Sequence, residues 1–430
     1  MVSARVRAAL APFGVTLERD GGAGPRPNAP ALHALGALPP GSIALITGAS
    51  GGGKSTLLRA LGDQLDRQGE GVRRLEATRL ARSRRRVIDL VPGRLRHALG
   101  ALARAGLGEA GLLARRACEL SEGERWRLAL AIGIARGGTW LLADEFCSVL
   151  DRETARGVCA ALARWVRSGT GRLVAASAHA DLAPMLGPDL CVRVELGGAT
   201  SLRRGLPLRA PSIRIEPGGI EDYDALASLH YRSGRPATWT RVLRTVSGRR
   251  TVGVLVESRP TLNAAWRDLP WPGRFTRGDK RARARRLNRE LRCISRVVVD
   301  PRWRSMGVAR RLVEAALSSR PTPGVEAVAA MGAFNPFFER AGMIPYPAPV
   351  SYADARLGDA LEHAGLSARD LIVGWQADRA GRDPLVRREL RRWAGSSRAT
   401  RRLVGQPWGA IARAAGVRLA MRPVCYAFAG

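Results

Sequence analysis

Apolar positions recur along this chain in two patterns, as short continuous runs and as longer segments with helical spacing. The runs at 42–47, 139–143 and 172–177 are almost entirely apolar, which is typical of strands buried in a core. Residues 56–61 and 125–136 carry apolar side chains at helical spacing instead. Short buried strands followed by helices predict an α/β fold for this half of the chain.

The second half repeats the pattern after a break rich in proline, at Pro207, Pro211 and Pro217. A β-branched strand at 293–299 precedes a short loop and a helix, and 325–331 reads as the next strand. We therefore expect three parts, at residues 1–205, 206–349 and 350–430.

The last part is expected to be a basic, mostly helical extension. Its predicted helices are 353–364, 366–373, an arginine-rich stretch and a helix that starts at 406–412. The closing run 423–428 is predicted to be a strand that either completes the preceding sheet or forms a small cap.

The loop after the first strand matches the phosphate-binding pattern G-x-x-x-x-G-K-[ST]. Almost every cation in the chain is arginine, and the only lysines are Lys54 and Lys280. A compact ammonium reaches between nucleotide phosphates where a planar guanidinium would crowd them. Glycines and the helix N-terminus that follow a strand favour anion binding. The predicted phosphate-binding residues are Gly48, Ala49, Ser50, Gly51, Gly52, Gly53, Lys54, Ser55 and Thr56.

Two carboxylates, Asp144 and Glu145, end the strand at 139–143. In a P-loop enzyme the first acid supports Mg²⁺ together with the loop hydroxyl, here Ser55, and the second polarises the attacking water. We expect Mg²⁺ at Ser55 and Asp144, and Glu145 as the general base.

Three further segments occur in a recognisable order. Leu120–Arg127 reads LSEGERWR, Ser148–Asp151 follows Glu145 closely, and His179 follows the strand at 172–177. Together with the P-loop they resemble the ABC-type ATPases, whose signature is LSGGQ-x-x-R. The resemblance implies ATP and Mg²⁺ as ligands and a head-to-tail homodimer.

Within that resemblance, further residues have implied roles. His179 matches the histidine that senses the γ-phosphate, and Asp151 lies in the D-loop. The signature residues that would contact ATP across the dimer are Ser121, Glu122 and Gly123.

Some positions depart from the family pattern. Glu122 replaces a glycine of the signature, and Glu124 replaces its glutamine. The expected strand 86–91 offers Asp89 where a metal-contacting glutamine is usual, and Phe13 is a weak candidate for the aromatic residue that stacks on adenine. The short segment before the signature leaves little room for the helices on which a transporter's membrane domains dock.

The loop after the strand 293–299 carries Arg304-x-x-Gly307-x-Ala309. It resembles the pyrophosphate-binding motif of the GNAT acyltransferases, and Asn335–Met343 resembles a second segment of that family. The resemblance implies acetyl-CoA binding by Val298, Val299, Arg304, Ser305, Met306, Gly307, Val308, Ala309, Asn335 and Phe338. Many members have a tyrosine at the position of Phe338 that protonates the leaving thiolate, and phenylalanine lacks that proton. Glu290, Cys293, Ser295 and Tyr346 are alternative proton donors among which the sequence does not choose.

The net charge of the chain indicates which kinds of partner to expect. The formal net charge is +33, with 70 Lys plus Arg against 37 Asp plus Glu, and cations concentrate at 274–292 and 379–402. This predicts binding to DNA or RNA phosphates without base specificity, or alternatively a basic surface that attracts anionic CoA and ATP.

No apolar run approaches the length of a membrane span, and residues 1–12 lack the apolar stretch of a signal peptide. Six scattered cysteines favour a reducing, cytoplasmic setting.

The sequence therefore predicts a P-loop, ABC-type nucleotide-binding domain followed by a mixed α/β GNAT-like domain. We expect ATP hydrolysis coupled to acetyl-CoA-dependent N-acetylation near nucleic acid. Two alternatives stay open: the ATP-binding subunit of an ABC transporter, and an ABC ATPase whose second domain binds acyl-CoA without transferring the acyl group.

Overall fold

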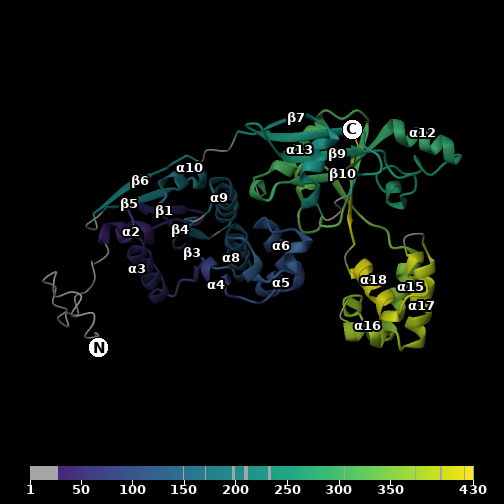
Figure 1. Cartoon of the computed structure of the whole chain (residues 1–430), viewed down its shortest axis with the longest axis horizontal. Coiled ribbons are helices and arrows are strands. Elements are labelled where there is room, and N and C mark those ends of the chain that lie inside the picture. Colours follow the sequence, from purple (N-terminus) through teal and green to yellow (C-terminus); the bar gives the residue numbers. More distant parts are fainter. Residues whose placement is uncertain are drawn as a thin grey trace. The chain divides into compact units, whose positions relative to one another are not determined.

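Two units make up the chain in the computed structural model (Figure 1). One contains Met1–Arg82 and Arg136–Arg209, and the other contains Ser83–Ala135 and Ala210–Gly430. The structure describes residues 28–148, 150–169, 171–195, 199–207, 212–230, 234–304, 306–372, 374–397, 400–420 and 422–429. Phe13 and Ser305 lie outside the described residues.

A six-stranded sheet in the order β2-β3-β4-β1-β5-β6 forms the first unit. All neighbours pair in parallel except β5 and β6, which are antiparallel. The strands are β1 Ile43–Gly48, β2 Val72–Arg74, β3 Trp140–Ala143, β4 Arg172–Ala176, β5 Leu190–Val194 and β6 Thr200–Arg204. The three predicted strands of this half are confirmed as β1, β3 and β4.

Helices cover this sheet because its central strands are apolar on both faces. Ile43, Ala44, Leu45 and Ile46 of β1 are fully buried. The α3 leucines at 57, 58, 61 and 65 share one core with β1, β3, β4 and β5, and each buried leucine contributes about 2 kcal/mol of hydrophobic stabilisation. The helices are α2 Ala29–Gly36, α3 Lys54–Arg67, α4 Ala77–Leu80, α9 Arg152–Arg167, η3 Ala180–Leu182 and α10 Ala183–Leu186.

A helical segment opens the second unit. Its elements are α5 Val87–Leu90, α6 Leu95–Arg104, α7 Ala110–Leu113, η2 Ala117–Glu119 and α8 Glu122–Arg136. The predicted strand at 86–91 is wrong, because only Arg86 makes a bridge, to Arg116, and the following residues form α5. Val87 and Val91 are buried and lie four residues apart, a spacing that one helical turn satisfies.

The second unit also contains a seven-stranded sheet in the order β12-β13-β11-β10-β9-β8-β7. Only β10 and β11 pair in parallel. The strands are β7 Arg214–Gly218, β8 Arg241–Ser247, β9 Arg250–Ser258, β10 Leu291–Val299, β11 Gly324–Ala329, β12 Ile344–Pro347 and β13 Val424–Ala429. The predicted strands at 293–299 and 325–331 are thus confirmed, with small shifts at their ends.

The closing strand β13 completes this sheet, since it pairs with both β11 and β12. The associated helices are α11 Ile220–Leu226, η4 Ala227–Leu229, η5 Ala265–Asp268, α12 Lys280–Glu290, η6 Pro301–Trp303, α13 Val308–Ser318 and α14 Phe337–Arg340. Leu312, Val313 and Ala316 of α13 are buried in one core with β11 and with Tyr426 of β13.

A helical module is inserted between β12 and β13 (Figure 1). It consists of α15 Tyr352–His363, η7 Asp370–Ile372, α16 Gly374–Ala380, α17 Pro384–Gly395, η8 Arg401–Leu403 and α18 Trp408–Ala420, which enclose a core of their own. The predicted helix at 366–373 is reduced to η7. Asp370 accepts hydrogen bonds from the backbone N–H and hydroxyl of Ser367, at 2.7 and 2.8 Å, and such local bonds compete with a regular helix.

Candidate functional site

The phosphate-binding loop joins the end of β1 to the start of α3. Gly53 caps α3 in the left-handed region, with φ +97°. Gly48 has φ +142°, and a side chain there would place its Cβ 1.9 Å from the carbonyl oxygen of Val194. Only glycine fits both positions, so the sequence pattern and the backbone agree.

The Lys54 ammonium lies within this loop. Its Nζ donates to the carbonyl oxygens of Gly48, at 3.0 Å, and Ala49, at 2.6 Å. The positive charge is thereby held beside the N-terminus of α3, where an anion is stabilised.

The first turn of α3 meets the end of β3. Ser55 Oγ donates to Asp144 Oδ1 at 3.0 Å, and the backbone N–H of Glu145 donates to the same oxygen at 3.0 Å. A hydroxyl and a carboxylate side by side are the oxygen ligands that Mg²⁺ prefers, with nucleotide phosphates and water completing its shell. Within the described ranges no cluster of three or more His, Cys, Asp and Glu side chains is present.

Glu145 lies in a tight turn after β3. Its φ is +46° and that of Cys147 is +53°, both in the left-handed region that costs a side chain energy. The turn is anchored by Phe146, which is fully buried and whose N–H donates to the carbonyl oxygen of Ala176 at 2.8 Å. Anchoring Phe146 leaves the neighbouring Glu145 carboxylate exposed to solvent.

His179 bridges two segments that follow different strands. Arg152 Nη2 lies 3.0 Å from His179 Nδ1, and His179 Nε2 lies 3.0 Å from the carbonyl oxygen of Ser148. A guanidinium only donates, so Nδ1 accepts and Nε2 carries the proton that is donated to Ser148. Arg152 is held in turn by Asp181 at 2.8 Å. The ring is thus tied to the Ser148–Asp151 segment.

Asp151 has a structural partner of its own. It caps α9 by accepting from the N–H groups of Glu153 and Thr154, each at 3.0 Å, and from the Thr154 hydroxyl at 2.6 Å. Burial alone would raise the pKa of Asp151, but these hydrogen bonds outweigh it and lower the pKa below the usual range.

The signature residues Ser121, Glu122 and Gly123 lie in the second unit, at the start of α8. Ser121 and Glu124 form a capping box, in which Ser121 N–H donates to Glu124 Oε2 at 2.7 Å and Glu124 N–H donates to Ser121 Oγ at 3.3 Å. Glu124, which stands at the position of the family's glutamine, therefore helps to cap the N-terminus of α8. Asp89 is exposed on α5, also in the second unit.

The second glycine loop joins β10 to α13. Gly307 caps α13 with φ +81°, and Val308 is buried behind it. Arg304 is directed at protein groups: its Nε donates to the Val299 carbonyl oxygen at 3.1 Å, and it forms an ion pair with Glu109. Any anion at this loop would therefore meet backbone groups rather than the Arg304 charge.

Asn335 is exposed, whereas Phe338 is buried beside Tyr426, with ring centroids 5.1 Å apart. Tyr426 Oη donates to Glu339 Oε1 at 3.1 Å. Burial, and then Glu339, raise the pKa of this phenol, so it keeps its proton. Sequence reasoning missed Tyr426, because it lies on the closing strand far from the motif. The strand pattern of residues 423–428, which contain Tyr426, was the only available indication in the sequence.

Two of the proton donors considered from sequence, Glu290 and Ser295, have partners within the protein. Glu290 pairs with Arg274 at 2.8 Å and with Arg289 at 3.1 Å. Ser295 Oγ lies 2.6 Å from Ser258 Oγ. Burial raises the pKa of the Cys293 thiol to about 12. Tyr346 packs near Trp266, with ring centroids 6.4 Å apart.

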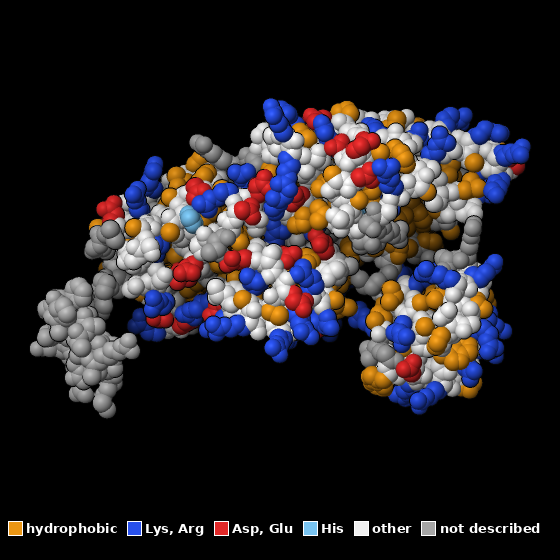
Figure 2. Space-filling view, in the orientation of Figure 1, with side chains coloured by type: hydrophobic (Ala, Val, Ile, Leu, Met, Phe, Trp, Pro, Cys, Tyr) orange, Lys and Arg blue, Asp and Glu red, His pale blue; other side chains and the backbone are white. Residues whose placement is uncertain are grey.

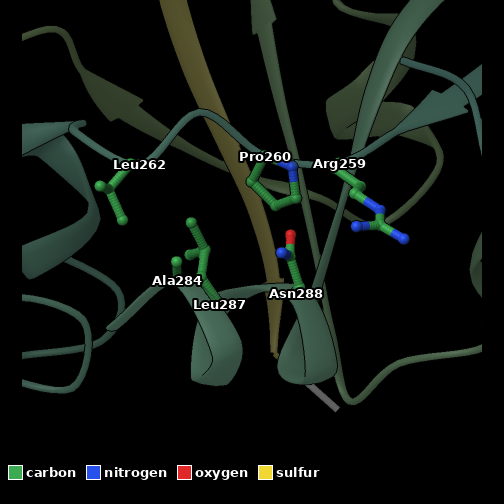
Figure 3. Close-up of a pocket in the computed structure, with 6 residues that line it drawn as sticks. All are labelled: Arg259, Pro260, Leu262, Ala284, Leu287 and Asn288. Atoms are coloured by element: carbon green, nitrogen blue, oxygen red, sulfur yellow. The ribbon is translucent and has the colours of Figure 1, made fainter. Parts of the chain in front are cut away.

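A cavity of about 250 Å³ lies between the end of β9 and α12 (Figure 3). It is lined by Arg259, Pro260, Leu262, Ala284, Leu287 and Asn288. None of these is a predicted nucleotide or acyl-CoA residue, and the cavity belongs to neither candidate site.

Comparison with known proteins places the nucleotide site in a family. Residues 35–148 match the family model described as ABC transporter. The aliphatic sulfonates import ATP-binding protein SsuB 2 of Nocardia farcinica is 33% identical over 180 residues, covering 39% of this chain and 75% of that protein. The phosphonates import ATP-binding protein PhnC of Stutzerimonas stutzeri is 33% identical over 201 residues, covering 35% and 70%.

Other relatives are matched over less of their length. The macrolide export ATP-binding/permease protein MacB of Marinobacter nauticus is 30% identical over 162 residues, covering 30% of this chain and 25% of that protein. For SsuB 3 of Nocardia farcinica the chain spans 56% of the relative. Solved structures of a metal-chelate type ABC transporter and of a dimeric bacterial ABC transporter cassette match with TM-scores of 0.34 and 0.32, each at 19% identity. They cover 42% and 38% of this chain and 82% and 86% of theirs.

No helix in the described part of the chain is long and apolar enough to cross a membrane. The phosphate-binding loop of the chain, the Ser55–Asp144 hydrogen bond and the matched relatives all indicate one family. The chain belongs to the family of ABC transporter ATP-binding proteins.

Proposed function

We propose that the chain is an ATP-binding and ATP-hydrolysing subunit of an ABC-type assembly. The observation that supports this proposal is that Asp144 Oδ1 accepts hydrogen bonds from both the Ser55 hydroxyl and the backbone N–H of Glu145. Lys54 and the loop N–H groups hold the phosphates. Ser55 and Asp144 would hold Mg²⁺, which would supply positive charge beside the γ-phosphate.

Hydrolysis needs a base beside the attacking water. The exposed Glu145 accepts the water proton or orients the water. On ATP binding, His179 would exchange the hydrogen bond from Nε2 to the Ser148 carbonyl oxygen for one to the γ-phosphate, and this exchange would release the segment that ends at Asp151. Ser121, Glu122 and Gly123 of a second copy complete the ATP site in a head-to-tail homodimer.

The first candidate partner is a membrane protein. The matched relatives are named import ATP-binding proteins or export ATP-binding/permease proteins. These names favour a transport subunit over the acetyltransferase interpretation. A transport role requires a separate membrane-spanning partner.

A second candidate function is acyl-CoA binding by the seven-stranded sheet. Strands β10 and β11 pair only between Leu291–Ile294 and Gly324–Ala327, although β10 continues to Val299. The pairing of β10 with its other neighbour, β9, has a register shift between Ile294 and Arg296, at the same place along β10. A gap between diverging parallel strands, next to the Gly307 helix start, suits an acyl-CoA chain whose pyrophosphate meets the loop.

Acetyl transfer on such a site would proceed by attack of an amine on the thioester carbonyl. The carbon–nitrogen bond forms, the carbon–sulfur bond breaks, the amine nitrogen loses one proton to solvent, and the leaving thiolate gains one. Phe338 has no ionisable group and supplies no proton to the thiolate. Binding without transfer therefore stays an alternative, as does a proton from Tyr426 or from solvent.

Contacts within the second unit offer a route for coupling the two activities. Arg127 of the signature helix α8 is buried and donates through Nη1 to the Pro301 carbonyl oxygen, three residues before Arg304. Burial, and then Arg304, lower the pKa of Arg127 to about 10, yet it stays charged near neutral pH. Glu109 pairs with Arg304 on the same loop. A shift of α8 on ATP binding would thus reach the second glycine loop.

Nucleic acid is a further proposed partner. It rests on the charge of +33 and on the basic segments 274–292 and 379–402. No observation of base-reading geometry supports sequence specificity.

Three measurements on purified full-length protein separate these proposals. ATP hydrolysis with Mg²⁺ tests the first, and retention of the protein by membranes of its own cells tests the transport partner. Titration calorimetry with acetyl-CoA and with free CoA tests the second sheet. Binding without turnover on any amine would leave a ligand-binding module, and absence of binding would remove acyl-CoA altogether.

A further inference from the structure

The helical module α15–α18 carries an unusual cation cluster on α17. Residues 384–402 contain seven arginines and one acid, Glu389. Figure 2 shows Lys and Arg side chains along the edge of the module where Figure 1 labels α17.

The arginines of α17 divide into two sets. Arg388 and Arg392 lie 3.4 and 3.0 Å from the buried carboxylate of Glu389, which Arg356 also reaches at 2.7 Å. Arg387 and Arg391 instead lie over the ring of Trp408, with Cζ 4.7 and 5.4 Å from the ring centroid. Residues four apart share one helix face, so α17 presents two guanidiniums to one indole.

Other stacked arginines of the module have acid partners. Arg418 lies over Trp393 and pairs with Asp354 at 3.2 Å, and Arg356 lies over Tyr352 and pairs with Glu389. Among the described residues, Arg387 and Arg391 have no ion pair with a carboxylate. Two like charges on one ring repel each other, and a bound anion would offset that repulsion.

Trp408 itself is fixed in place. A side chain at the buried Gly381 would put its Cβ 2.7 Å from Trp408 Cβ, so the indole is seated against the α16–α17 turn. A guanidinium that is already stacked loses little freedom when it binds, and its planar fork suits two phosphate oxygens.

We propose that Arg387, Arg391 and Trp408 form a binding site for the phosphate backbone of a nucleic acid strand. The exposed Arg401 and Arg402 extend the cluster. The 12 residues of α17 span about 18 Å, the length of roughly five nucleotides of one strand. This inference rests on the nucleic-acid partner proposed above and assigns its contact. Trp393, which also lies in the segment 379–402, is buried and donates to Asp354, so it is not part of this site.

The test is fluorescence anisotropy of the full chain with a labelled 20-nucleotide single strand, its duplex and the RNA equivalent, over a range of salt concentrations. Arg387→Gln with Arg391→Gln should weaken binding at least about tenfold and reduce the salt slope by about two. Arg369→Gln with Arg413→Gln removes the same charge from exposed positions of the module outside the segment 379–402, and should weaken binding less than about threefold.

Two further variants separate the geometry from the charge. Trp408→Leu keeps every charge and should weaken binding severalfold with an unchanged salt slope, because the two guanidiniums lose the aromatic ring on which they stack. Arg387→Lys with Arg391→Lys, which keeps the charge without the planar fork, should fall between the wild type and the glutamine pair, and thermal melting confirms that each variant folds.

Equal losses in the two glutamine pairs would overturn this site while leaving nucleic acid as a partner. Binding of the wild type to phosphatidylserine vesicles but to none of the three polymers would assign the cluster to a membrane surface. No binding to any probe would remove both proposals, and ATP hydrolysis would then stand alone.

Discussion

Two glycine loops of this chain have the same local design and use their cations differently. Each follows a strand and opens a helix with a left-handed glycine, Gly53 before α3 and Gly307 before α13. Lys54 turns back onto carbonyl oxygens of its own loop, so its charge stays at the anion site. Arg304 is committed to the Val299 carbonyl and to Glu109.

The difference separates recognition by side-chain charge from recognition by backbone. The first loop is expected to depend on its lysine, because a triphosphate and Mg²⁺ concentrate charge there. The second is expected to depend more on its glycine, because Arg304 is already bonded to the Val299 carbonyl oxygen and to Glu109.

Lys54→Ala should lower the ATP hydrolysis rate by at least about 100-fold, since it removes a preorganised charge from the transition state. Lys280→Ala, at the only other lysine, is the matched control and should leave the rate unchanged. A steady-state phosphate-release assay measures both. A Lys54→Ala rate within threefold of the wild type would contradict the assignment of this loop.

Gly307→Val should weaken acetyl-CoA binding at least about tenfold in calorimetry, because a β-branched residue resists the left-handed backbone. Gly248→Val imposes the same strain in the β8–β9 turn, where φ is +59°, and should leave binding unchanged. Arg304→Ala should reduce binding less than Gly307→Val does. The reverse order would mean that the side chain, and not the backbone, recognises the ligand.

His179→Ala should slow ATP hydrolysis by about tenfold, equivalent to about 1.4 kcal/mol in the barrier. The reason is that the Ser148 segment loses the ring that reports the γ-phosphate. ATP binding, measured with a fluorescent analogue, should change less than threefold. Loss of binding together with rate would make His179 a structural residue.

Asp151→Ala should lower the free energy of unfolding by about 1 kcal/mol, the usual value of an N-cap. The folded-state pKa of Asp151 lies below its unfolded value, so its contribution is fully present above the ordinary carboxyl pKa and is lost as pH falls through the folded-state pKa. Urea unfolding at pH 7 and pH 3 should therefore show a smaller difference between variant and wild type at the lower pH. An equal difference at both values would rule out the charged cap.

Sequence alone was sufficient where the chemistry is local. The P-loop, the Asp144–Glu145 pair and the Gly307 helix start are continuous segments whose residue types dictate their backbone. The strand predicted at 86–91 failed because Val87, Ile88, Leu90 and Val91 satisfy a strand or a helical turn equally. The segment forms a helical turn of four residues, and only Arg86 makes a β-bridge, to Arg116.

Contacts between distant segments were beyond prediction. Tyr426 reaches Phe338 only because β13 returns to the sheet after the inserted module. Trp408 meets Arg387 and Arg391 because α18 packs beside α17. The Arg127 contact to Pro301 joins residues 174 positions apart. Composition indicated a basic surface, and the fold decided which arginines lack an acid partner.

The most direct test of the central claim is the molar mass of the Glu145→Gln variant in solution, by light scattering with and without Mg²⁺ and ATP. Removing the general base should trap bound ATP. We therefore expect a mass that doubles on adding ATP and that reverts when Lys54→Ala is also present. A variant that binds ATP stoichiometrically yet stays at the mass of one chain would contradict the ABC-type mechanism proposed for this protein.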